Sequence, residues 1–161
     1  MYKRQGEGRH VKRVEKIDSH TGIVLTNGVF DILHKGHIEL LKFAKLQGDK
    51  LIVAIDSDDR VKEIKGDDRP INNEEDRRRI LETNMYVDSV VTFKSTEELR
   101  KLYVTLCPDV IVNGSEWTAD EVRERDIIPE SIQIKVYPLV GEYSTTNTMQ
   151  KIRGMEKCEK T

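Results

Sequence analysis

The chain of 161 residues carries 27 basic and 29 acidic side chains, a formal net charge of −2 at pH 7, and 37% of its residues are hydrophobic. This length predicts one domain with a core that folds alone. The nearly balanced charge gives no reason to expect a nucleic-acid partner, and no apolar run is long enough to cross a membrane. Cys107 and Cys158 match no redox or metal spacing and no signal peptide precedes them, so we expect a cytoplasmic protein.

Both ends of the chain are charged. Residues 1–20 predict a leader, either solvated or acting as a basic arm that touches a partner. We place the domain at residues 21–153 and a charged, frayed tail at residues 154–161.

The first element is an apolar run at residues 23–25, which predicts a buried strand. Asn27 and Gly28 break it, and a helix begins near Gly36. A strand, a glycine turn and a helix start present backbone N–H groups and a positive dipole end to an anion. His34 and His37 lie three residues apart at this junction, so both imidazoles can face one phosphate. The alternatives are ordinary turn residues or a metal pair, although no further ligands stand at closed spacing.

Hydrophobic periodicity and turn signals place the remaining elements. We expect helices at residues 37–47 (ended by Gly48), 58–64, 73–84, 96–105, 118–125 and 146–153, and strands at residues 51–55, 89–93, 110–112 and 132–136. Strands that alternate with helices over short connections predict a doubly wound, Rossmann-like α/β fold with a parallel five-stranded sheet. Loops at the carboxyl ends of such strands meet at one rim, where ligands bind.

Basic residues follow the second strand. Lys65 and Arg69 lie in a loop and are candidates to bind a phosphate. Arg77, Arg78 and Arg79 are consecutive in a predicted helix, and each step turns about 100°, so at most one or two can face a cleft. Arg77 is the weaker phosphate candidate.

The opening stretch resembles a known signature. Gly28, Phe30, Asp31, His34, Gly36 and His37 match the G-x-F-D-x-x-H-x-G-H pattern of the cytidylyltransferase-like nucleotidyltransferases. The resemblance implies an enzyme that joins a nucleoside triphosphate to a phosphorylated sugar or polyol and releases pyrophosphate. It also implies Mg²⁺ held mainly by the nucleotide, with no metal ligands from the protein.

Later motifs refine the resemblance. These motifs are Lys65-Gly-Asp-Asp-Arg69-Pro70, Pro108-Asp109-Val-Ile-Val, Asn113-Gly114-x-Glu116-Trp117 and Ser144-Thr145-Thr146. As a set they look most like those of the adenylyltransferase domains of ADP-heptose synthases. Those domains join ATP to D-glycero-β-D-manno-heptose 1-phosphate. The related glycerol-3-phosphate cytidylyltransferases, which use CTP, usually lack the lysine–arginine loop and carry arginines where this chain has Met85 and Leu139. A CTP-dependent enzyme of that kind and an inactive nucleotide-binding regulator stay open as alternatives. We expect a stand-alone transferase, and a homodimer by analogy.

The resemblance and the loop positions together assign roles to individual residues. The expected catalytic residues are His34, His37 and Lys65. The expected nucleotide-binding residues are Asn27, Gly28, Val29, Phe30, His34, Gly36, His37, Asn113, Gly114, Ser144, Thr145 and Thr146. The expected substrate-binding residues are Asp31, Asp56, Lys65, Arg69, Arg77 and Trp117, with a turn-stabilising role open for Asp31.

Overall fold

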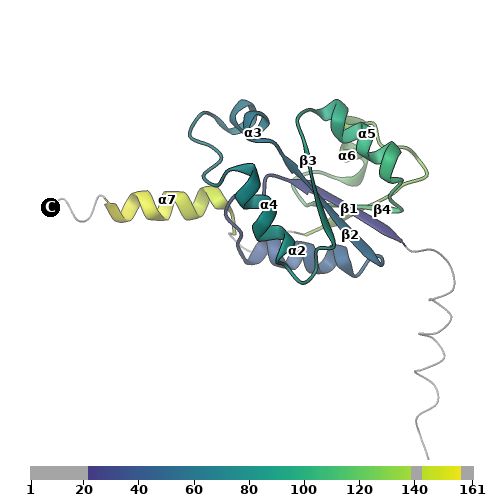
Figure 1. The fold of residues 1–161 in the computed structure, drawn as a ribbon, viewed down its shortest axis with the longest axis horizontal. Helices are drawn as coiled ribbons and strands as arrows, with labels where there is room; N and C mark the ends of the chain where they lie inside the picture. The colour runs from purple at the N-terminus through teal and green to yellow at the C-terminus, as the bar shows by residue number, and fades with distance from the viewer. Residues whose placement is uncertain (1–21, 139–142, 157–161) are drawn as a thin grey trace, which may run out of the picture.

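The computed structural model describes residues 22–138 and 143–156, which form a sheet covered by helices on both faces (Figure 1). The predicted leader at residues 1–20 lies outside the described residues. Of the predicted tail, residues 154–156 are described, and they continue the last helix.

All strand pairs of the five-stranded sheet are parallel, in the order β3-β2-β1-β4-β5. The strands are β1 (Ile23–Gly28), β2 (Lys50–Asp56), β3 (Ser89–Phe93), β4 (Val110–Gly114) and β5 (Gln133–Tyr137). The chain therefore adds strands outward from β1 on one side and then returns to add β4 on the other. This is the doubly wound α/β arrangement that the sequence predicted.

Six helices lie among the described residues: α2 (Lys35–Lys45), α3 (Asp58–Lys65), α4 (Glu74–Glu82), α5 (Thr96–Leu106), α6 (Ala119–Asp126) and α7 (Thr145–Glu156). Helices α2 and α4 cover one face of the sheet, and α5 and α6 cover the other, whereas α7 runs away from it (Figure 1). Across the described residues, we find no helix with both the length and the apolarity to span a bilayer.

The two faces of β1 explain why its apolar run is continuous. Val24 joins a core with Leu41 and Ala44 of α2, whereas the next residue, Leu25, joins a separate core with Leu99 and Tyr103 of α5. Successive strand residues point to opposite faces, so a strand buried on both faces must be apolar at every position.

The seam between β1 and β4 is the point where the strand order reverses. Thr26 pairs with Val112 across this seam, so Asn27 and Asn113 follow on each strand at its carboxyl end. Ligands of doubly wound folds bind outside the carboxyl ends of the strands at such a switch point. The topology thus predicts that a ligand binds at the loops that follow β1 and β4.

The prediction that Gly48 caps α2 was wrong. The helix ends at Lys45, and Leu46 is the C-cap with an ordinary right-handed conformation. Gly48 is needed for a different reason, because a Cβ there would lie 2.6 Å from the carbonyl oxygen of Gly22 and 2.8 Å from Val24 Cγ2. The glycine lets the chain pass close to the start of β1 as it enters β2.

Candidate active site

His34 stands at the start of α2 as its N-cap. Its Nδ1 accepts a hydrogen bond from the backbone N–H of His37 over 3.4 Å. Because Nδ1 acts as an acceptor, the neutral ring carries its proton on Nε2. Burial lowers the pKa of His34. Burial therefore keeps the His34 imidazole neutral, and the N-cap bond favours the tautomer whose Nε2–H is left to donate to another group.

His37 stacks on His34, with ring centroids 3.8 Å apart and planes inclined by 19°. Burial, and then the neighbouring His34, lower the pKa of His37 to about 4. The ring of Phe30 lies on its other side, with the centroids 5.1 Å apart. The prediction that both imidazoles gather at the helix start is confirmed, and at neutral pH both are uncharged.

The turn before the helix is shaped by Phe30, which is 4% exposed and has a φ of 49°, in the left-handed region. A Cβ on Gly28 would lie 3.2 Å from the Phe30 ring, so the ring packs closely over the end of β1. This packing explains why the stretch requires a glycine and an aromatic residue in this order.

Polar atoms without a partner gather at the switch point. Asn27 Oδ1, Asn113 Oδ1 and His37 Nδ1 are buried and have no hydrogen-bond partner among the described residues. An unpaired buried polar atom costs on the order of 1–3 kcal/mol. Three such atoms at the carboxyl ends of β1 and β4 and at the start of α2 are the pattern expected of a polar ligand site.

Asp31 holds the loop that follows α3. Its carboxylate is 1% exposed and accepts hydrogen bonds from the N–H groups of Ile71 and Asn72, each over 2.8 Å. It also pairs with Arg69 Nε at 3.1 Å, while the Asn72 amide donates to the Asp31 carbonyl. Of the two roles left open for Asp31, the structure supports the turn-stabilising one.

Arg77 is buried completely and stays inside the fold. Its guanidinium donates to the carbonyl oxygens of Val29 and Asn72 and forms an ion pair with Asp58 at 2.8 Å. Val29 lies in the loop after β1, Asp58 is the first residue of α3, and Asn72 lies in the loop after α3. We therefore replace the predicted phosphate-binding role of Arg77 with a positioning role that ties these loops together.

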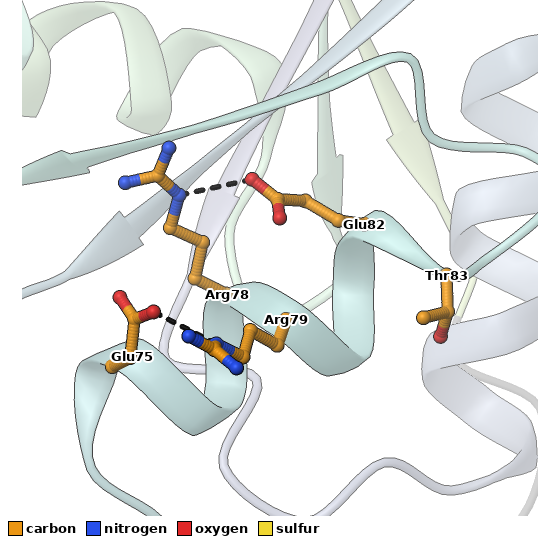
Figure 2. Close-up of a pocket in the computed structure, with 5 residues that line it drawn as sticks. All are labelled: Glu75, Arg78, Arg79, Glu82 and Thr83. Carbon is orange, nitrogen blue, oxygen red and sulfur yellow. Dashed lines mark hydrogen bonds and ion pairs between the residues drawn. The ribbon is translucent and has the colours of Figure 1, made fainter.

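The neighbouring arginines point outward, which agrees with the prediction that at most one or two of the three can face a cleft. Arg78 pairs with Glu82 and Arg79 pairs with Glu75 along the exposed surface of α4, where they line a shallow hollow with Thr83 (Figure 2). This hollow is lined by α4 and the residue that follows it, and none of the candidate site residues lines it. Exposed pairs of this kind contribute little to stability.

Two other predicted substrate residues differ in accessibility. Lys65 is exposed at the end of α3 and can reach a ligand. Asp56 is 6% exposed and pairs with Arg60 Nε at 2.7 Å. Burial raises the pKa of Asp56 in spite of this arginine. The geometry favours a structural role for Asp56.

Trp117, beyond β4, rests on a rigid support. The guanidinium carbon of Arg125 lies 5.3 Å from the centroid of the Trp117 ring. Arg125 is itself held by both carboxylate oxygens of the buried Asp126, at 2.9 and 2.7 Å. Trp117 remains 46% exposed, so its indole can still meet a ligand. This contact could not be predicted from the sequence, because the sequence of α6 is that of an ordinary charged helix.

The side chains of the hydroxyl-rich turn before α7 make different contacts. Ser144 Oγ accepts from the N–H of Asn147, which is an N-cap bond, and Thr145 Oγ1 donates to the carbonyl of Ile32 over 3.3 Å. Thr146 is exposed. The second bond fixes the start of α7 beside the histidine loop. Two helix N-termini, those of α2 and α7, are thus joined through residues 30–34.

Comparison with known proteins agrees with this geometry. A family model described as cytidylyltransferase-like matches residues 25–155, from β1 to the end of α7. The chain belongs to the cytidylyltransferase-like family. The match includes the histidine loop, both asparagines of the switch point and the start of α7.

Curated relatives in this family share much of the sequence. The chain is 40% identical over 157 residues to the bifunctional protein HldE of Aliarcobacter butzleri, covering 92% of this chain and 32% of that protein. It is 44% identical over 132 residues to HldE of Campylobacter fetus, covering 82% and 28%. The chain thus spans about a third of the length of these relatives.

Among solved structures, a lipopolysaccharide core biosynthesis protein from Thermoplasma volcanium superposes with a TM-score of 0.62 at 29% identity. The match covers 76% of this chain and 98% of that one. Family and fold together make this chain a nucleotidyltransferase.

Proposed function

We propose that this domain is an adenylyltransferase that joins ATP to D-glycero-β-D-manno-heptose 1-phosphate and releases pyrophosphate. The observation that carries the proposal is the pair of neutral, stacked imidazoles at the start of α2, beside unpaired polar atoms at the switch point. The similarity to HldE and the lysine–arginine loop support the heptose substrate.

The chemistry needs little from the protein besides position and charge. An oxygen of the sugar phosphate attacks the α-phosphorus of ATP, and the bond from that phosphorus to the bridging oxygen of pyrophosphate breaks. The attacking phosphate is already ionised, so no base has to remove a proton. Catalysis then rests on in-line placement and on donors aimed at the developing charge.

The donors lie at two helix starts. In this proposal His34 Nε2–H and the His37 ring donate to the triphosphate, while Ser144, Thr145 and Thr146 bind its outer phosphates through N–H and hydroxyl groups. Lys65 approaches the sugar phosphate, and Arg69 assists through the nitrogens that Asp31 does not occupy. Trp117 offers a flat apolar surface to the base or the sugar.

Mg²⁺ enters in this proposal as part of the nucleotide substrate. Among the described residues, no group of three or more histidine, cysteine or acidic side chains is arranged to hold a metal ion, and the Asp31 carboxylate already binds the loop at residues 69–72. In this proposal phosphate oxygens and water hold the cation, since Mg²⁺ keeps several of its waters. The ion would neutralise part of the phosphate charge.

The test is pyrophosphate release with ATP or CTP against a panel of acceptors. We expect the highest kcat/KM with ATP and D-glycero-β-D-manno-heptose 1-phosphate. Mannose 1-phosphate and glycerol 3-phosphate serve as matched acceptors that differ in sugar and in chain. A preference for CTP with glycerol 3-phosphate, or no release with any pair, would overturn the proposal.

Two further expectations from the sequence remain proposals. A cytoplasmic location is supported by Cys107, which is an exposed free thiol of the kind that a reducing compartment preserves. A homodimer is expected by analogy, and light scattering of the purified chain would test it. A mass of one chain across the concentration range would reject the dimer.

A further inference from the structure

One aromatic side chain beside the histidines has no role so far. Tyr143 directly precedes the hydroxyl-rich start of α7, and its ring lies near that of His34, with centroids 6.5 Å apart and planes inclined by 25°. His37 lies closer to His34, at 3.8 Å. Two rings thus lie near His34 with planes inclined to it by 25° or less, and the Tyr143 ring is within the range of offset aromatic contacts.

The contact is built into the backbone beneath it. A Cβ at Gly36 would lie 3.1 Å from two atoms of the His34 ring and 3.3 Å from Tyr143 Cβ. Such contacts are tighter than ordinary van der Waals packing, so glycine is what allows both rings to approach the first turn of α2. Gly36 was predicted as a nucleotide-binding residue, and this packing supplies a second reason for its presence.

Two further contacts fix where Tyr143 lies. The adjacent turn is anchored by the hydrogen bond from Thr145 Oγ1 to the carbonyl of Ile32. On the α2 side, Lys35 Nζ lies 6.0 Å from the centroid of the Tyr143 ring, at the limit of a cation–π contact. The tyrosine therefore sits between the start of α2 and the start of α7.

We propose that Tyr143 is a positioning residue, whose ring holds the His34 imidazole in the orientation that presents Nε2–H to a bound phosphate. The inference rests on the proposed function. The N-cap bond to His34 Nδ1 is long, at 3.4 Å, so it does not fix the plane of the ring alone. Rings beside the imidazole restrict its rotation. Tyr143 also directly precedes α7, the helix that would bind the outer phosphates, so it links the orientation of His34 to the position of that helix.

In this proposal the ring of Tyr143 positions His34, and its hydroxyl group is not needed. Tyr143→Phe should therefore behave as the unchanged protein, and Tyr143→Ala should not. Tyr143 is 47% exposed, so its truncation leaves the core intact. Ile152→Ala in α7, the helix that follows Tyr143, is the matched control, because Ile152 is also exposed, at 53%, and lies well inside that helix.

The experiment measures two quantities on the full chain. Nitrogen-15 NMR of the histidine rings, without nucleotide, reports which nitrogen of His34 carries the proton, and pyrophosphate release reports turnover. We expect Tyr143→Ala to give mixed tautomers of His34 and to lower kcat by about 10- to 100-fold, the scale of a small misplacement of a reacting group. Tyr143→Phe and Ile152→Ala should keep the Nε2–H tautomer and near-normal kcat.

The two readouts separate the possible failures. If Tyr143→Ala leaves both the tautomer and kcat unchanged, the proposal is overturned. It is also overturned if kcat falls while the tautomer stays fixed, because the ring would then act in some other way. If the unchanged protein releases no pyrophosphate with any substrate pair, the proposed function fails, while a mixed tautomer in the alanine variant would still support the contact.

Discussion

At the scale of single residues, the histidines derive their properties from their place in the fold. His34 is neutral because burial lowers its pKa, and its Nδ1, which caps α2, leaves Nε2–H as the donor. His37 is neutral because it is buried against another imidazole. A donor that is already oriented and desolvated stabilises developing charge without reorganising during the reaction. The start of α2 thus prepares both rings before any nucleotide arrives.

Loss of one donor should show in turnover. We expect His37→Ala to lower kcat by about 10²–10³-fold, by comparison with the loss of a single oxyanion-hole donor. Lys42→Ala, an exposed substitution on the same helix, should leave kcat unchanged. Steady-state pyrophosphate release measures both. Near-normal kcat in the His37 variant would remove that ring from the mechanism.

The lowered pKa of His37 should also appear in stability. The unfolded chain takes up this proton near pH 6.5 and the folded chain only near pH 4, so between these values the unfolded state binds more protons. The free energy of unfolding should therefore fall as the pH drops from about 6.5 to about 4. Each unit of pKa difference is worth about 1.4 kcal/mol, so the total loss is on the order of 3 kcal/mol.

Urea unfolding at several pH values measures this loss. The His37→Gln variant removes the titrating group, so its free energy of unfolding should fall less over the same range. Parallel pH dependences for the variant and the unchanged protein would argue against a depressed pKa at His37.

Lys65 should affect one substrate more than the other. Because Lys65 is exposed beside the Arg69 loop, Lys65→Ala should raise KM for the sugar phosphate several-fold more than KM for ATP. Lys62→Ala, on the same helix and equally exposed, is the control. An equal effect of Lys65→Ala on both KM values would place its charge on the nucleotide instead.

At the scale of the elements, α4 shows how one helix divides identical side chains between two roles. Arg77 is buried and joins two loops to the start of α3, whereas Arg78 and Arg79 form exposed pairs with glutamates four residues away. Helical geometry requires the three to diverge but does not say which one turns inward. That choice depends on Val29, Asn72 and Asp58, which reach α4 only in the folded chain.

The arginines therefore offer a matched comparison. Arg77→Met should lower the free energy of unfolding by about 3 kcal/mol, since it leaves a carboxylate and two carbonyl groups without their partner. Arg78→Met and Arg79→Met should change it by about 0.5 kcal/mol or less. Chemical denaturation measures all three. Equal effects would mean that the buried network contributes nothing beyond an exposed pair.

Replacing either of two glycines by alanine should change the free energy of unfolding in opposite directions. Gly48→Ala should lower the free energy of unfolding by about 1–3 kcal/mol, because the new methyl group meets the Gly22 carbonyl. Gly154→Ala in α7 has open space around its Cβ and should stabilise that helix by up to about 1 kcal/mol. Thermal unfolding of both variants measures the difference. A stable Gly48→Ala protein would contradict the close approach of the chain at β1.

At the scale of the whole molecule, much of the fold could be predicted because its strands are short apolar runs with clear turns between them. The histidine pair could be predicted because its signature is local. The contacts of Arg77 with Val29 and of Asp31 with Asn72 could not, since these residues are far apart in the sequence. The contact of Trp117 with Arg125 could not either, since it depends on how the loop after β4 packs against α6. The doubly wound sheet brings these loops to one rim, where residues from separate motifs lie together and form the candidate site.

The central claim is that the paired imidazoles at the start of α2 bind the phosphates of the nucleotide. A crystal structure with a non-hydrolysable ATP analogue and Mg²⁺ tests it most directly. We expect His34 Nε2 to lie about 2.7–3.2 Å from a phosphate oxygen, with His37 facing the same group. A bound nucleotide whose phosphates lie away from both rings would contradict it.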